Sequence, residues 1–396
     1  MSTRRVILHV GTPKTGTSHL QDVLFRNRGV LERHGIRYPA ERFDGQFLAA
    51  LDLMKLTWGG LETEAVGAWD ALAAQVRAWP GTSIVSHEIL ATATPTQVAA
   101  ALESFGPDAE VHLVLSVRDL VRQIPAEWQE NVKHRSLVTY GTFLDQIRDP
   151  ERGSRIGAWF WGVQELPDIL DRWGASLPPE RVHLVTVPRP GAPRDELWRR
   201  FSETFGLDGI PLDLEGERAN PSLGVPETAL LREINQRVTK IIAPADYRPL
   251  VREILAHQTL SARPSPRLGL PESVHTWAQD LSRSWVSELD QRGYQVVGDL
   301  ADLVGAEPGA YADPDTVAAD DLLEPAYDAI KALLVEGTRL RASEERLRVE
   351  RDELLHRVSV LERGKRKVVR TLNDSRAGRQ VLDVYRRARR RNSRSA

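Results

Sequence analysis

Residues 4–21 read RRVILHVGTPKTGTSHLQ, an apolar run followed by a turn rich in glycine and threonine. The run over 5–10 has the composition of a buried strand, and the apolar positions over 17–34 recur at helical spacing, which predicts one helix. A strand, a tight turn and a helix in this order form the first unit of an α/β sheet. The helix N-terminus after the turn also favours an anion, so this stretch is the first candidate site.

The alternation of strand and helix patterns continues through the first half of the chain. Short apolar runs predict further strands over 36–39, 83–86, 111–117 and 181–187, the last of the series. Such alternation is typical of a parallel sheet with helices on both faces. We therefore predict an α/β fold, a P-loop-type parallel sheet flanked by helices.

Beyond these strands the pattern changes. The region of about 226–304 reads as mostly helical and completes a domain over 1–305. Residues 306–320 are rich in Pro, Gly, Ala and Asp, which is typical of a linker.

A C-terminal helical or coiled-coil extension is predicted over 321–362. Leucine recurs there every seven residues, at Leu340, Leu347, Leu354 and Leu361. This spacing predicts a short coiled coil and self-association through 333–361.

The composition bounds the class of protein. The chain has 396 residues, of which 41% are hydrophobic and 27% charged, as is ordinary for a soluble globular protein. It has no cysteine, which excludes disulfides, zinc-thiolate sites and thiol nucleophiles. No apolar run approaches the ~20 residues that span a bilayer, and strand-like residues from Arg5 leave no room for a secretory signal. We expect a cytoplasmic protein.

The segment 363–396 differs in charge from the rest of the chain. It holds 13 Lys and Arg against two Asp, a net charge of +11, whereas the remaining residues carry a net charge of −13. Apolar residues accompany this charge at Val381, Leu382, Val384 and Tyr385. We expect this basic tail to attach at the inner membrane surface, since anionic lipids attract basic segments by about 1 kcal/mol per charge. A disordered solubilising tail is the alternative, and nucleic acid is the less favoured partner.

The position of Lys14 separates this loop from ATP- and GTP-binding loops. Those loops read G-x-x-x-x-G-K-[ST], with the lysine directly after the second glycine. Here Lys14 precedes Gly16 by two residues. The backbone amides still favour an anion, but the lysine points to a different atom of it and the magnesium-binding arrangement is lost.

The loop PKTGTS(HL) resembles the 5′-phosphosulfate loop of sulfotransferases that use 3′-phosphoadenosine-5′-phosphosulfate (PAPS) and no metal. The resemblance covers about residues 5–305. This part of the chain is similar to a bacterial, actinobacterial-type sulfotransferase-like subgroup. The resemblance is carried by the segments RDLVRQIPAEWQENVKHR, WGASLPPERVHLVTVP, NPSLG and GYQVVGDLADL. The resemblance implies that Lys14 contacts the oxygen bridging phosphate and sulfonyl group. It also implies that the 5′-phosphate is held by the loop residues Pro13, Lys14, Thr15, Gly16, Thr17 and Ser18.

The resemblance implies a second part of the cofactor site after a later strand. Arg118 ends the run LVLSVRD, where the family places an arginine that binds the 3′-phosphate. An arginine at the end of a buried strand is costly unless it meets an anion; pairing with Asp119 is the alternative. The serine expected eight residues later is Ala126, and Arg122, one helical turn earlier, is the candidate replacement.

Transfer to a hydroxyl requires a base, for which histidine or glutamate is the usual choice. Glu88 is the first candidate and His87 the second, since both follow the predicted strand over 83–86. Capping of the next helix is the alternative role of both residues, and His19 is a further candidate base. The segment HEILA lacks the second histidine of a zinc-protease motif. Residues predicted to line an acceptor channel are Trp128, Gln129, Glu130 and Lys133.

The resemblance implies a PAPS-dependent sulfotransferase that acts on a hydroxyl acceptor, a carbohydrate, a glycolipid or a small metabolite. One alternative is an ATP-dependent P-loop phosphotransferase with Asp119 as a metal ligand. The other is a non-catalytic sulfotransferase-like scaffold that uses its coiled coil and basic tail.

Overall fold

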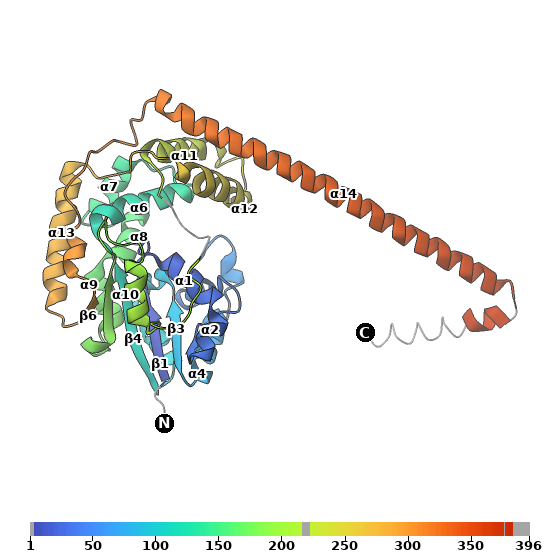
Figure 1. The fold of residues 1–396 in the computed structure, drawn as a ribbon, viewed down its shortest axis with the longest axis horizontal. Coiled ribbons are helices and arrows are strands. Elements are labelled where there is room, and N and C mark those ends of the chain that lie inside the picture. Colours follow the sequence, from blue (N-terminus) through green and yellow to red (C-terminus); the bar gives the residue numbers. More distant parts are fainter. Residues whose placement is uncertain (1–3, 216–221, 376, 383–396) are drawn as a thin grey trace. The chain divides into compact units, whose positions relative to one another are not determined.

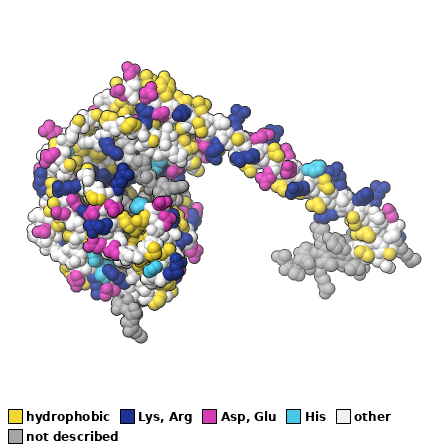
Figure 2. Space-filling model, viewed as in Figure 1, with side chains coloured by type: hydrophobic (Ala, Val, Ile, Leu, Met, Phe, Trp, Pro, Cys, Tyr) yellow, Lys and Arg dark blue, Asp and Glu magenta, His cyan; other side chains and the backbone are white. Residues whose placement is uncertain are grey.

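The computed structural model describes residues 4–215, 222–375 and 377–382. The chain forms two compact units, Met1–Ala329 and Ile330–Ala396. The first is an α/β domain and the second is dominated by one long helix (Figure 1). Charged side chains of both signs are spread over the visible face of each unit (Figure 2). No helix in the described ranges is long and apolar enough to cross a membrane.

A six-stranded parallel sheet forms the centre of the first unit, in the order β2-β3-β1-β4-β5-β6. The strands are β1 (Arg4–His9), β2 (Ile36–Arg37), β3 (Thr82–Ser86), β4 (Ala109–Val117), β5 (Val182–Thr186) and β6 (Gln295–Val297). The sheet confirms the expected α/β class. The prediction that 181–187 is the last strand is wrong, because β6 pairs with β5 after a long helical excursion.

Helices connect and cover these strands. In chain order they are α1 (Thr17–Arg26), α2 (Arg28–Arg33), α3 (Gly45–Met54), α4 (Ala68–Ala78), α5 (Pro95–Ser104), α6 (Leu120–Lys133), α7 (Tyr140–Arg148), α8 (Arg155–Gln164), α9 (Leu166–Gly174), α10 (Glu196–Phe205), α11 (Val225–Val238), α12 (Pro244–Tyr247) and α13 (Glu272–Asp290). A π-helix over Arg248–Thr259 continues from α12.

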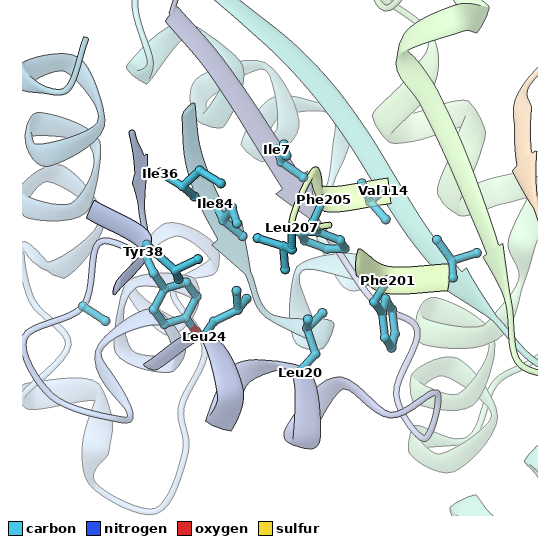
Figure 3. Close-up of a cluster of buried hydrophobic side chains, with 13 residues drawn as sticks. Ile7, Leu20, Leu24, Ile36, Tyr38, Ile84, Val114, Phe201, Phe205 and Leu207 are labelled. Atoms are coloured by element: carbon cyan, nitrogen blue, oxygen red, sulfur yellow. The ribbon is translucent and has the colours of Figure 1, made fainter. Parts of the chain in front are cut away.

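One face of the sheet is covered by α1 and α10. Ile7, Ile84 and Val114 of the sheet pack in one buried cluster with Leu20 and Leu24 of α1 (Figure 3). Phe201 and Phe205 of α10 complete this cluster. The helix α9 packs on β4, and its Trp173 is fully buried. This packing fixes the strand ends, on which the candidate site is built.

The single helix predicted over 17–34 is two helices. The Asn27 side chain donates to the Val23 carbonyl at 2.8 Å and to the Asp213 carbonyl at 2.9 Å. The Oδ1 atom of Asn27 accepts from the Asp213 backbone amide at 2.9 Å. An asparagine that bonds a distant backbone segment in this way competes with helical hydrogen bonding, so α1 and α2 separate there.

The predicted linker over 306–320 is attached to the first unit, which extends past the predicted boundary at 305. The Asp315 carboxylate accepts from the amides of Tyr140 at 3.0 Å and Gly141 at 2.9 Å, at the start of α7. Asp315 also lies 3.5 Å from Arg232. The segment 306–320, whose composition is typical of a linker, is therefore held to the first unit by hydrogen bonds.

The extension predicted over 321–362 is the helix α14 (Leu323–Asn373), which continues past the predicted end. Its leucine repeat lies on an exposed face. Only part of the predicted basic tail, 363–375 and 377–382, lies within the described residues.

Candidate active site at the carboxyl ends of the strands

The loop over 11–18 lies where the strand order reverses. The strand β1 has β3 on one side and β4 on the other, and ligands of such sheets bind beyond the carboxyl ends at this point. Gly11 accepts from the Ser116 amide at 2.6 Å, and Thr12 donates to the Ser116 carbonyl at 2.7 Å. A β-carbon added at Gly11 would lie 3.0 Å from the Glu88 carbonyl oxygen. The loop is therefore in contact with the residues that end β3 and β4.

The backbone of the loop turns sharply at Lys14 and Gly16. Both have left-handed conformations, with φ of 64° at Lys14 and 92° at Gly16. The φ at Gly16 lies in a region that residues with a β-carbon rarely adopt, so this position favours glycine. A β-carbon there would also approach Cδ2 of Leu197 to 2.8 Å. The amides of His19 and Leu20 donate to the Gly16 carbonyl, each at 3.1 Å. Within the described residues no side chain caps the amides of Thr17 and Ser18, which leaves these two N–H groups for an anion.

The hydroxyl groups of the loop have different roles. The Thr15 hydroxyl is buried and donates to the Thr12 carbonyl at 2.6 Å, so it holds the loop together. Thr17 is buried, whereas Ser18 is exposed at the start of α1. Of the three, Ser18 is the hydroxyl most open to a ligand.

A neutral hydrogen-bonded network lies beneath the loop. The fully buried His9 contacts the Ser86 hydroxyl through Nδ1 at 2.8 Å and the Ser116 hydroxyl through Nε2 at 3.0 Å. The Ser116 hydroxyl also contacts Thr15 Oγ1 at 2.5 Å. Burial lowers the pKa of His9 to about 4, so its ring is neutral at pH 7. This network connects the ends of β3, β1 and β4 without any charge.

The opposite side of the loop is charged. The ammonium of Lys14 forms an ion pair with Glu130 of α6. Glu130 also lies 3.1 Å from both Arg252 and His134. Burial acts to raise the pKa of Glu130, but His134 and Lys14 outweigh it and hold this pKa well below its usual range. Glu130, predicted as part of an acceptor channel, is thus the partner of the loop lysine.

Glu127 is a functional candidate that the sequence reasoning missed. It lies on the same helical face as Glu130, and its Oε1 accepts from Gln123 at 3.3 Å and from Gln164 at 3.1 Å. Gln123 in turn donates to the Pro13 carbonyl at 2.8 Å, which connects this carboxyl to the loop. Burial raises the pKa of Glu127 to about 7, and nearby Lys14 opposes the rise. The spacing of three residues from Glu130 was the available sequence signal.

Arg118 lies at the end of β4, as predicted, and donates to the Lys14 carbonyl at 3.3 Å. Its Nε is buried and has no hydrogen-bond partner among the residues that the structure describes. Burial lowers the pKa of Arg118 to about 10, with a further contribution from neighbouring Arg122. Within the described residues Arg118 makes no ion pair with a carboxylate, so the alternative pairing with Asp119 does not form.

Arg122 pairs with Asp119, and its other nitrogens donate to the carbonyls of Pro188 at 2.9 Å and Val187 at 3.4 Å. Asp119 is buried, and its second oxygen accepts from the Arg122 amide at 2.9 Å. These bonds must open before Arg122 can bind a phosphate. Ala126 lies on α6 and contributes no hydrogen-bonding group from its side chain.

The two candidate bases after β3 lie beside the loop but are already engaged. Glu88 accepts from Gln21 at 2.9 Å. His87 accepts through Nδ1 from the Ile89 amide at 3.3 Å, as the predicted helix-start cap, and stacks on Phe47 at 5.0 Å. Burial lowers the pKa of His87. Burial acts to raise the pKa of Glu88, but His87 and a backbone amide outweigh it, so both groups lie on the deprotonated side at pH 7.

Four predicted residues remain: Trp128, Gln129, His19 and Lys133. Trp128 is fully buried against Tyr140 and donates to the Val138 carbonyl at 3.0 Å, so it belongs to the core and not to a channel. Gln129 is also buried and donates to the Leu223 carbonyl at 2.8 Å and to the Thr228 hydroxyl at 3.2 Å, and the second bond joins α6 to α11. His19 is exposed near Trp198. Burial lowers the pKa of Lys133 to about 8, and Lys133 is electrostatically coupled to both Lys14 and Glu130.

Comparison with protein-family models, with curated proteins and with solved structures gives no significant match to this chain.

Proposed function

We propose that the chain is a sulfotransferase that moves a sulfonyl group from PAPS to a hydroxyl acceptor. The carbohydrate, glycolipid and small-metabolite classes remain the candidate acceptors. The observation that carries the proposal is a pair of cationic side chains at the place where the strand order of the sheet reverses. Lys14 and Arg118 come from the ends of adjacent strands and are joined at 3.3 Å through the Lys14 carbonyl.

Arg118 supports a cofactor with a second phosphate. A buried guanidinium with an unpaired Nε is costly, and a phosphate provides the charge and the planar acceptor pair that relieve this cost. The open amides at the start of α1 suit the 5′-phosphate, and Lys14 lies on the same loop. The residues present therefore fit an adenosine bisphosphate cofactor, and Ala126 removes one expected donor.

When bound, PAPS would supply an activated sulfonyl group and an anionic leaving group. Lys14 would stabilise the negative charge of this leaving group once its ammonium releases Glu130. Glu130 keeps Arg252 and His134 as partners during this exchange, so its carboxylate remains compensated. The ion pair is in this sense the resting arrangement of the catalytic lysine.

Besides His19, the acceptor proton has three candidate destinations. Glu88 and His87 follow β3, and Glu127 lies on α6 within the electrostatic reach of Lys14. A base is most effective when its pKa lies near the working pH, and the Glu127 pKa of about 7 meets this condition. We propose Glu127 as the base alongside Glu88, the first choice from the sequence.

The phosphotransferase alternative receives less support. It assigns Asp119 to a metal, yet both oxygens of Asp119 already bind Arg122. The scaffold alternative is supported by Ala126 and predicts no cofactor binding. The basic segment 363–396 remains a proposed attachment to an anionic membrane surface at the cytoplasmic side, independent of the reaction.

Titration calorimetry with adenosine 3′,5′-bisphosphate, with and without magnesium, tests the proposal. We expect metal-independent binding that is weakened at least tenfold by Arg118→Gln. Arg283→Gln is the matched control, since Arg283 is an exposed arginine of α13 that pairs with Asp280. A preference for ATP with magnesium supports the phosphotransferase, and absence of binding supports the scaffold.

A further inference from the structure

The leucine repeat of α14 is exposed along the helix. The exposed fractions of Leu340, Leu347, Leu354 and Leu361 are 47%, 63%, 52% and 64%. Figure 2 shows hydrophobic side chains interleaved with charged ones along this helix. A helix of 51 residues, about 77 Å long, gains most of its stability from packing its apolar stripe. The seven-residue spacing indicates that the packing partner is another helix of the same period.

The second seam position of the repeat, four residues after each leucine, is largely polar. It is occupied by Gly337, Glu344, Arg351, Val358 and Lys365. In a parallel pair of identical helices each of these residues faces its own copy. Glu344, Arg351 and Lys365 would then form three like-charge layers inside the seam, which is unfavourable.

We propose that α14 pairs with α14 of a second copy of this chain in antiparallel orientation. In the register we infer, Leu347 faces the partner's Val358 and Leu354 faces the partner's Arg351. The same register sets Glu344 against the partner's Leu361 and Leu340 against the partner's Lys365. Each charged seam residue then lies against an aliphatic side chain and extends its charged end to solvent.

The rim of the seam agrees with this register. Glu350 lies beside the partner's Arg357, and the two-fold axis repeats this attraction. On the other rim Leu334 lies beside the partner's Val369. In a parallel pair Glu350 lies beside the partner's Leu355 instead. Exposed ion pairs contribute only about 0.2–1 kcal/mol each, so they select the register while the leucine layers supply the stability.

Engineered cysteines test the orientation directly, because the natural chain contains none. Full-length Leu347→Cys and Val358→Cys variants are mixed, equilibrated under reducing conditions and then oxidised. We expect a disulfide-linked dimer from the mixture and little from either variant alone, since identical positions lie about eleven residues apart along the pair, or about 16 Å. Val349→Cys, on the outer face of the helix, is the matched control and should cross-link with neither.

Three outcomes overturn the proposal. Efficient cross-linking of Leu347→Cys alone indicates a parallel pair. A chain that sediments as a monomer at about 50 µM excludes the pair. Binding of the chain to vesicles of anionic lipid would not change this conclusion. Equal cross-linking of Val349→Cys with either variant indicates non-specific collision.

Charge exchange gives an independent measurement of the register. Glu350→Arg should weaken the dimer several-fold in sedimentation, because it sets two arginines side by side. Glu350→Arg combined with Arg357→Glu should restore it. In a parallel pair the first substitution has no such partner, so unchanged affinity contradicts the proposed register.

Discussion

The two sides of the loop over 11–18 differ in how they hold it. On the side of the sheet, His9, Ser86 and Ser116 form a neutral network in which each bond stays in place over a wide pH range. On the side of α6, Lys14 is held by the charge of Glu130. The loop is therefore held rigidly by the neutral network on the sheet side. On the α6 side it is held by Glu130, which an anionic ligand can replace.

The difference follows from the cost of moving each group. A buried neutral hydrogen bond that is lost leaves unsatisfied polar atoms, whereas an ion pair can exchange one anion for another with little net change in charge. Substitutions on the α6 side should therefore change binding and turnover as well as stability, whereas substitutions on the sheet side should change stability alone.

The largest expected effect is that of Lys14→Ala on sulfonyl transfer. By analogy with the loss of one oxyanion-hole donor, it should raise the barrier by roughly 3–4 kcal/mol. PAPS turnover, followed by separation of the adenosine bisphosphate product, measures it. The circular dichroism spectrum should stay unchanged, and turnover retained within tenfold would remove the role assigned to this lysine.

Glu130→Gln should separate stability from binding. It removes the carboxylate that compensates Lys14 and Arg252, both only partly exposed, and should cost about 3 kcal/mol in the free energy of unfolding. The affinity for adenosine 3′,5′-bisphosphate should rise several-fold because Lys14 no longer has a competing partner. Glu233→Gln, which breaks an exposed pair with Arg237, is the control for urea unfolding. Weaker binding by Glu130→Gln would contradict the exchange.

Glu127→Gln should change how stability depends on pH. The folded pKa of about 7 lies above the ordinary value, so Glu127 contributes stability below about pH 4 that is lost as the pH rises through 7. At about 1.4 kcal/mol per pKa unit, the rise from 4.5 to about 7 corresponds to about 3.5 kcal/mol, of which the wild-type protein should lose about 2–3 kcal/mol between pH 5 and pH 8 relative to the variant. Urea unfolding at pH 5 and pH 8 measures the difference. Parallel curves for the two proteins would place this carboxyl in solvent.

His9→Asn tests the rigid side and should have the smallest effect. An asparagine cannot bridge both hydroxyls, so the unfolding free energy at pH 7 should fall by about 1–2 kcal/mol. The pKa of His9 is lowered to about 4, so wild-type stability from this group falls as the pH drops from about 6.5 to 4, and the variant lacks this component. A change in cofactor affinity larger than the change in stability would show that the two sides are not separable.

The sequence predicts the parts of the site that depend on local patterns. The strand, the glycine turn and the start of a helix lie within residues 4–21, and Arg118 directly follows an apolar run, so the loop and the arginine were both found. The place of β6 depends on pairing with β5, more than 100 residues earlier, and three residues carry too little pattern to predict it. The pKa of Glu127 depends on Lys14 and on Gln164 of α8, which only the folded chain brings together. Trp128 was misassigned because a helix pattern does not tell a core-facing aromatic from one that lines a channel.

A lysine that is already neutralised has consequences for selectivity in a solution full of small ions. Chloride or inorganic phosphate must displace Glu130 from the Lys14 ammonium without the help of further contacts, and neither offers enough in return. A nucleotide that engages Arg118 and the helix amides at the same time can do so. The loop should therefore bind the commonest small anions only weakly. We expect millimolar phosphate to compete weakly with adenosine 3′,5′-bisphosphate for this site.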